Sequence, residues 1–173
     1  MRKIYRYRIN RVKLQAGTTL VEVLVSMIVL SGGMLGIAGV HSVSLRANQA
    51  AYYRTLATTL TQDIVERMRA NTSGVDFGDY DNVAGAATAS CFTSVGCNRT
   101  QLAAQDMLDW TAQVAAGFPL GAAVVCIDST MPDGTAAAFA CDGVGSIYAI
   151  KIFWDDNRDG TADQAYTTTF QPL

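Results

Sequence analysis

An acidic stretch near the end of the chain has residues spaced like the ligands of a calcium loop. Such a loop places carboxylate, amide and carbonyl oxygens at alternating positions, with a glycine at the sixth. The residues at these positions are Asp155, Asn157, Asp159, Gly160, Thr161 through its carbonyl, and Asp163. At the twelfth position Tyr166 replaces the usual glutamate, so calcium binding at this loop would be weak. The sequence favours the alternative, a solvated hairpin loop around Asp159-Gly160.

Four cysteines form a second group with defined chemistry, and all of them follow the apolar segment described below. Because a positive leader holds the other end of that segment in the cytoplasm, they face an oxidising periplasm and two disulfides are expected. Three connectivities are open, and we favour Cys91–Cys97 with Cys126–Cys141, pairs that close loops at hydrophilic turns. Zinc is the alternative, but the sequence has no Cys-x-x-Cys and its one histidine, His41, lies at the membrane edge.

The rest of the chain contains no recognisable catalytic group of residues. Beyond the apolar segment there is no histidine to act as a base and no glycine-rich phosphate loop after a strand. From Asp76 onward, 3 basic residues stand against 12 acidic ones, a net charge of −9. This charge argues against a surface that binds nucleic acid. We therefore expect neither an enzyme nor a nucleic-acid-binding protein.

A single carboxylate, Glu22, interrupts the apolar N-terminal part of the chain. It is followed by 18 uncharged, mostly apolar residues, 23–40, which nearly suffice for a helix to cross a bilayer. A carboxylate left unpaired in lipid costs on the order of a few kcal/mol, so Glu22 needs a cationic partner. Cleavage after Gly17 would provide one, the new amino terminus of Thr18 in a neighbouring subunit. The alternative is that Glu22 lies at the depth of the lipid headgroups.

The basic leader, Gly17, the short apolar lead-in, Glu22 and the uncharged run together resemble the class III leader of type IV pilins and pseudopilins. Residues 36–40, 45–52 and 63–71 are similar to minor pilins of the PilV kind, the type IV pilus modification proteins. The resemblance covers residues 15–71. It implies cleavage after Gly17 by a prepilin peptidase, N-methylation of Thr18 and a role in assembly for Glu22. One position departs from the pattern, because the first mature residue is Thr18 rather than Phe or Met.

One long helix has to position the N-terminal residues. Beyond residue 40 the apolar residues recur at helical spacing, and Asp63 and Arg67 form an i,i+4 pair on the same helix. The apolar stripe consists of Tyr53, Ala57, Leu60, Ile64 and Met68. We expect one helix over residues 20–71, half in the membrane and half under a head domain, ending at the polar turn 71–74.

The remaining residues predict a small head that covers this stripe. Residues 75–100 are expected to form a long surface loop, and residues 101–116 a helix whose apolar face contains Leu102, Leu108, Trp110 and Val114. Strands are expected at 122–127, 147–154 and 166–170. The predicted fold class is α+β and type IV pilin-like, a long N-terminal helix packed against a small antiparallel sheet. The predicted divisions are a leader at 1–17, a membrane or filament-core helix at 18–44 and a periplasmic head at 45–173.

These residues and the resemblance together predict a minor pilin that acts in the assembly, priming or tip complex of a type IV pilus, and so in twitching motility or adhesion. It would sit in the bacterial inner membrane with its head in the periplasm and later appear on the pilus at the cell surface. Expected partners are other minor and major pilins, the prepilin peptidase and the inner-membrane assembly platform, and no cofactor is expected apart from calcium.

Several alternatives stay open at this point. They are a pseudopilin of a type II secretion system, a membrane-anchored periplasmic sensor or binding module, and a DNA-uptake pilin. A secretory signal peptide cut near Gly36-Ile37-Ala38 is disfavoured by Glu22 and by the length of the uncharged run.

Overall fold

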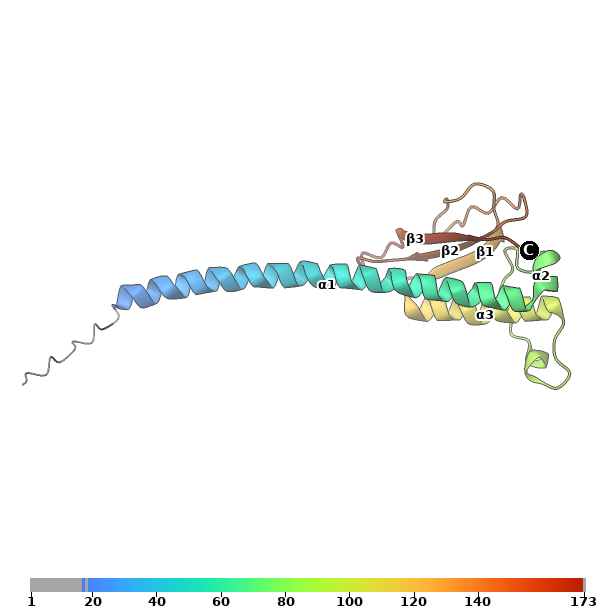
Figure 1. The fold of residues 1–173 in the computed structure, drawn as a ribbon, viewed down its shortest axis with the longest axis horizontal. Coiled ribbons are helices and arrows are strands. Elements are labelled where there is room, and N and C mark those ends of the chain that lie inside the picture. The colour runs from blue at the N-terminus through green and yellow to red at the C-terminus, as the bar shows by residue number, and fades with distance from the viewer. Residues whose placement is uncertain (1–16, 18, 173) are drawn as a thin grey trace, which may run out of the picture. The chain divides into compact units, whose positions relative to one another are not determined.

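The computed structural model describes residues 17 and 19–172, and its contacts divide the chain into two compact units, residues 1–45 and 46–173. Residues 1–16 of the predicted leader lie outside the described residues, and so does Thr18. In chain order the elements are α1 (Leu20–Ala70), α2 (Thr72–Asp76), the short 3-10 helix η1 (Ala89–Phe92), α3 (Arg99–Gly117), β1 (Ala122–Ile127), β2 (Tyr148–Trp154) and β3 (Gln164–Phe170), as labelled in Figure 1. The long helix and the three strands thus lie within two residues of their predicted bounds.

The part of α1 that belongs to the second unit carries the predicted apolar stripe. All five stripe residues are buried, together with Thr61. The side chains of Arg54, Gln62 and Glu66 face away from the core and are exposed. Asp63 accepts a hydrogen bond from Arg67 Nε at 2.9 Å, so the predicted i,i+4 pair is confirmed. The stripe is therefore the helical face on which the rest of this unit packs.

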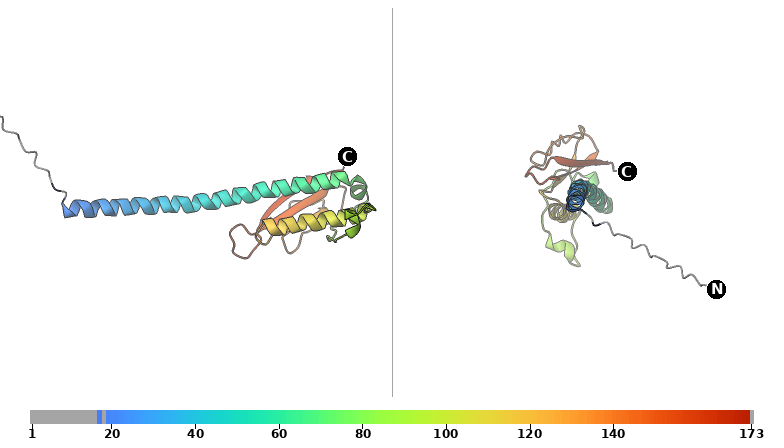
Figure 2. Two further views of the ribbon diagram at one scale, coloured as in Figure 1. Left: turned by 90° about the horizontal axis from the view of Figure 1, so that it is seen from below. Right: turned by 90° about the vertical axis from the view of Figure 1, so that its left-hand side faces the viewer.

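Helix α3 runs antiparallel to this part of α1, and the two helices lie side by side on one face of the sheet (Figures 1 and 2). Trp110 Nε1 donates to the carbonyl oxygen of Leu60 at 2.8 Å, which joins the two helices in the core. The helix begins in a capping box, in which Asn98 and Gln101 satisfy each other's backbone N–H groups. Its buried apolar side chains are Ala103, Met107, Trp110 and Val114. The predicted face was wrong at Leu102 and Leu108, which are only half-buried, because the true stripe follows the i, i+4, i+7 spacing from Ala103.

The sheet is antiparallel with the strand order β1-β2-β3. Ile150 in the central strand lies opposite Val125 of β1 and Thr168 of β3. All seven residues of β2 are buried, because the helices cover one face of the sheet and the segment after β1 covers the other. A long N-terminal apolar helix packed against a small three-stranded antiparallel sheet is the predicted α+β fold, which is thereby confirmed.

The segment 75–100 differs from the surface loop that was expected. It contains the end of α2, η1 and a fully buried tyrosine, Tyr80. The Tyr80 hydroxyl donates to Asp106 Oδ2 at 2.7 Å and accepts from Asn71 Nδ2 at 3.2 Å. Asn71 also caps α2 through a bond from the Gly74 N–H, so the polar turn 71–74 starts a second helix instead of a loop. This network ties the end of α1 to α3.

Candidate functional site

The start of α1 holds the residues that the sequence assigns to processing and assembly. Gly17 is exposed, and Thr18 lies outside the described residues. The Glu22 N–H lies 3.4 Å from the hydroxyl and 3.0 Å from the carbonyl oxygen of Thr19, which immediately precedes the helix. Thr19 is therefore the N-cap, and Glu22 occupies the third helical position, the Thr-x-x-Glu spacing of a capping box. The sequence analysis missed this role of Thr19, although the spacing alone indicates it.

Glu22 itself is exposed and reaches no cation among the described residues within 4.0 Å. The side chains that follow it are also exposed throughout 23–45. By length and composition α1 is apolar enough to cross a membrane, and none of the apolar window is buried within the structure. The hydroxyls of Ser26 and Ser31 donate to the carbonyls of Val23 and Ile28, so these polar groups are satisfied inside the helix. The segment thus presents apolar side chains and one carboxylate to whatever surrounds it.

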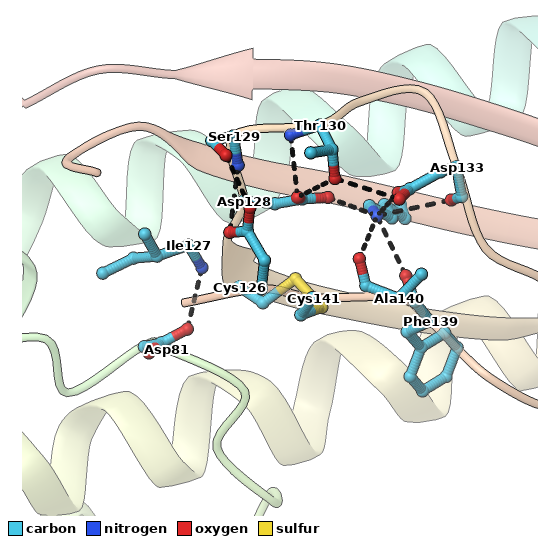
Figure 3. Close-up of a disulfide and its surroundings, with 12 residues drawn as sticks. Asp81, Cys126, Ile127, Asp128, Ser129, Thr130, Asp133, Phe139, Ala140 and Cys141 are labelled. Atoms are coloured by element: carbon cyan, nitrogen blue, oxygen red, sulfur yellow. Dashed lines mark hydrogen bonds and ion pairs between the residues drawn. A yellow bond between two sulfur atoms is a disulfide. The ribbon is translucent and has the colours of Figure 1, made fainter. Parts of the chain in front are cut away.

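Both disulfides of the favoured pairing are present in the structure. Cys91–Cys97 closes a short loop that begins within η1, and Phe92 and Val95 in this loop are strongly exposed. Cys126–Cys141 joins β1 to the segment that covers the outer face of the sheet (Figure 3). No free cysteine occurs among the described residues, so no thiol is left there to bind zinc.

A buried ionic cluster lies beside the second disulfide, and the sequence analysis did not foresee it. Lys151 in the middle of β2 is fully buried, and its ammonium lies 2.5 Å from Asp128 Oδ2 and 2.6 Å from Asp133 Oδ1. Figure 3 labels both aspartates. It also donates to the carbonyl oxygens of Phe139 and Ala140 at 2.9 and 3.3 Å. One lysine thereby holds both sides of the segment 128–141 against the sheet. The available sequence signal was a single lysine inside an otherwise apolar strand.

The contacts between Asp128 and Lys151 shift the pKa values of these two groups toward their charged forms. Burial alone would raise the pKa of Asp128, but hydrogen bonds from Lys151 and from the Thr130 N–H and hydroxyl outweigh it and lower that pKa. Burial alone would lower the pKa of Lys151, but hydrogen bonds to Asp128 and Asp133 outweigh it and raise that pKa. The arrangement is a charged, structural ion pair.

The acidic loop between β2 and β3 turns its oxygens toward its own backbone. Asp155, which is buried, accepts from the N–H groups of Arg158 and Gly160 at 2.6 and 2.8 Å. Asp159 accepts from Asn157 Nδ2 at 2.9 Å and from the Thr161 N–H at 2.8 Å, and these bonds, the one from Asn157 first, lower its pKa. Gly160 has a φ of 92°, a left-handed conformation that glycine tolerates. The loop is thus a self-bonded turn.

The remaining candidate calcium ligands do not extend this turn into a closed site. The Thr161 carbonyl oxygen accepts from the Asp163 N–H at 3.0 Å, and the Asp163 side chain is exposed. Across residues 17 and 19–172, no group of three or more His, Cys, Asp or Glu side chains is placed so that it could hold a metal ion. Calcium binding at Asp155, Asn157, Asp159, Thr161 and Asp163 stays a prediction.

Comparison with known proteins matches part of the chain to a family model. The family model Tt1218-like, described as type IV pilin Tt1218, matches residues 40–108, the second half of α1 and the segment up to the middle of α3. No curated protein and no solved structure matches the chain significantly. Pilins of this type are structural proteins that assemble with other pilins in a pilus. The long apolar helix and the small antiparallel sheet fit a membrane-anchored pilin that is later exposed at the surface, and over residues 40–108 the chain is similar to a type IV pilin.

Proposed function

We propose that this chain is a minor pilin of the PilV kind, which a prepilin peptidase cuts after Gly17 and which enters a type IV pilus through the N-terminal half of α1. The observation that carries the proposal is the continuous exposed segment 23–45, which contains no Asp, Glu, Lys or Arg and is preceded by one carboxylate, Glu22. An isolated soluble domain has no use for such a surface. A filament core built from packed apolar helices buries it.

In this account Glu22 pairs with the amino terminus of Thr18 in a neighbouring subunit. A charge pair inside an apolar helix bundle is strong because little water competes for either group. The pairing needs a free amine at Thr18 and therefore cleavage after Gly17. In this mechanism the uncut subunit is anchored in the membrane by its apolar helix. After cleavage the same helix leaves the membrane and packs in the core of the filament.

The test separates insertion from assembly. Glu22→Val makes the span more apolar, so the variant should insert in the membrane and be as stable as the wild type. It should nevertheless be depleted from sheared pili, since it has lost the charge that pairs with the neighbouring amine. Glu22→Gln is the matched control, because it keeps the size and hydrogen bonding of the side chain but removes its charge.

Both variants should show the same defect if charge is the reason. Normal incorporation of Glu22→Val would contradict the pairing mechanism. Incorporation of Glu22→Gln but not of Glu22→Val would assign the role to hydrogen bonding instead of charge.

A further inference from the structure

The two edges of the three-stranded sheet differ in whether their backbone groups have partners. At the β1 edge, the carbonyl oxygen of Val125 accepts from the Asn82 N–H at 2.9 Å. The Ile127 N–H donates to Asp81 Oδ1 at 2.7 Å, and the Ile127 carbonyl oxygen accepts from the Gly143 N–H at 3.0 Å. The segments 81–82 and 143 therefore cap the β1 edge. Within the described residues, no comparable bond reaches the outer edge of β3.

The register identifies which groups of β3 are open. In an antiparallel ladder, successive residues of a strand turn their N–H and C=O groups to opposite sides. The N–H and C=O groups of Val125 point away from β2, since its carbonyl oxygen accepts from Asn82. The N–H and C=O groups of its partner Ile150 therefore point toward β3, where they pair with those of Thr168. The neighbours Thr167 and Thr169 therefore turn their N–H and C=O groups outward, as does Ala165.

The open edge borders a groove against α1. The groove has a volume of about 430 Å³. Its lining residues are Thr58, Thr61, Gln62, Val65, Glu66 and Arg69 of α1 with Tyr166, Thr168 and Thr169 of β3. Thr61 is 5 % exposed, and its buried hydroxyl has no hydrogen-bond partner in the part of the chain that the structure describes. A buried hydroxyl without a partner is costly, and this one lies beside a groove in which every other lining side chain except Val65 is polar or carries a hydroxyl.

Strand β3 also lacks the features that protect edge strands from pairing. Native edge strands are usually short, bulged, or interrupted by proline or charged side chains. The seven residues Gln164–Phe170 contain no proline and no charge, and their register with β2 is continuous. An unprotected edge beside a polar groove is what strand addition requires.

We propose that the β3 edge receives a fourth strand, an extended and uncharged segment from a different pilin of the same filament. This inference rests on the proposed pilin function. Subunits of a helical filament all point the same way, so a second copy cannot present its own β3 edge around a twofold axis. The β1 edge of a second copy is already capped, as described above. A different pilin is thus the partner that fits, and its inward side chains meet the hydroxyl of Thr58 and the amide of Gln62.

Proline substitution tests the open amides without disturbing the sheet. Thr167→Pro removes an N–H that faces outward, so the pairing with β2 remains. Thr167→Val is the matched control, since it keeps the amide and the branched side chain. Thr168→Pro removes an N–H that faces β2 and should unfold the head, which checks the deduced register. Fluorescence melting of each full-length variant shows whether it folds.

Contact with a partner is measured by photo-crosslinking in pilus-producing cells. The full-length chain carries benzoylphenylalanine at Thr169, and the crosslinked peptides from sheared pili are identified by mass. The wild-type chain should crosslink to a segment of a different pilin. Thr167→Pro should reduce that yield about tenfold, as expected for the loss of one backbone hydrogen bond, while Thr167→Val changes it little.

Three results would overturn the inference alone: crosslinks only between copies of this chain, an unchanged yield in Thr167→Pro, or no crosslink although the chain is present in the pili. Absence of the wild-type chain from sheared pili would overturn the pilin function and, with it, this inference.

Discussion

Replacing Lys151 with methionine tests the energetic role of the buried ionic cluster. The side chain of Lys151 and that of Asp128 are both fully buried. Methionine keeps most of the volume of lysine but removes the ammonium, so Asp128 loses its counter-charge and keeps only the hydrogen bonds from the Thr130 N–H and hydroxyl. Three carbonyl oxygens, those of Asp133, Phe139 and Ala140, lose their donor as well.

The structure sets the expected size of this effect. Removing one partner of a buried ion pair costs roughly 3 to 5 kcal/mol. Because Asp128 keeps its two hydrogen bonds from Thr130, we expect the lower value, about 3 kcal/mol. For a head of this size about 1 kcal/mol shifts Tm by roughly 3 to 4 °C, and Lys151→Met should therefore melt about 10 °C lower. The double variant Lys151→Met, Asp128→Leu removes both charges and should recover most of the loss.

Tryptophan fluorescence is a suitable assay, because the chain has 2 tryptophans, Trp110 and Trp154, and both are buried in the head. The full-length protein in detergent can thus be melted with a signal that reports the head alone. A Tm within 2 °C of wild type for Lys151→Met would refute the reasoning, as would a double variant no more stable than the single one.

The same cluster determines how the stability of the head changes with pH. The pKa of Asp128 is lowered in the folded state, so its stabilisation is present above the ordinary value of 3.8 and is lost as pH falls through the lower folded pKa. The pKa of Lys151 is raised, so its contribution is present below 10.5 and is lost only as pH rises through the higher folded pKa. Melting of the wild type should therefore fall more steeply below about pH 4 than melting of the double variant.

Three further changes have expected outcomes. Replacing Cys126 and Cys141 with serine should lower the free energy of unfolding by about 3 kcal/mol, and the same change at Cys91 and Cys97 by about 2 kcal/mol, because the loops of 15 and 6 residues differ in closure entropy. Denaturant unfolding of the full-length variants shows which loss is larger. Tyr80→Phe should cost roughly 1 to 3 kcal/mol, since Asp106 and Asn71 lose a buried partner, and an unchanged unfolding midpoint would contradict this. If the acidic loop binds calcium, we expect a Kd of roughly 10⁻⁴ to 10⁻³ M. A tenfold excess of calcium over Kd should then add about 1.4 kcal/mol to the free energy of unfolding of the wild type and nothing to that of Asp159→Ala. Equal melting temperatures of the wild type with calcium and with chelator would show that the loop is a plain hairpin.

The sequence predicted the parts of the fold that periodicity controls. The stripe from Tyr53 to Met68 repeats at helical spacing, and β-branched and aromatic residues dominate the strands at 122–127 and 148–154, so their types and bounds agreed with the structure. Segment 75–100 was misjudged because its order depends on Tyr80 and Asn71, which act through hydrogen bonds to α3 that no local pattern reveals. Whether a polar segment is ordered thus depends more on tertiary contacts of this kind than on its composition.

The candidate site was predicted only in part for the same reason. Gly17, Glu22 and the four cysteines stand out by type and spacing along the chain. Lys151 does not, because its partners Asp128 and Asp133 lie about twenty residues away and meet it only once β1 and β2 pair. The open edge of β3 depends on the strand register and on the bonds that cap β1, which the sequence does not contain in readable form.

The central claim, that the chain is a processed pilin, is tested most directly by the intact mass of the protein recovered from sheared pili. We expect a species that begins at Thr18, with the mass of one methyl group added at its amino terminus and with all four cysteines oxidised. A chain that retains residues 1–17, or one that begins after Ala38, would contradict processing at Gly17. Complete absence of the chain from the sheared pili, with the protein present in the membrane, would contradict the pilin function itself.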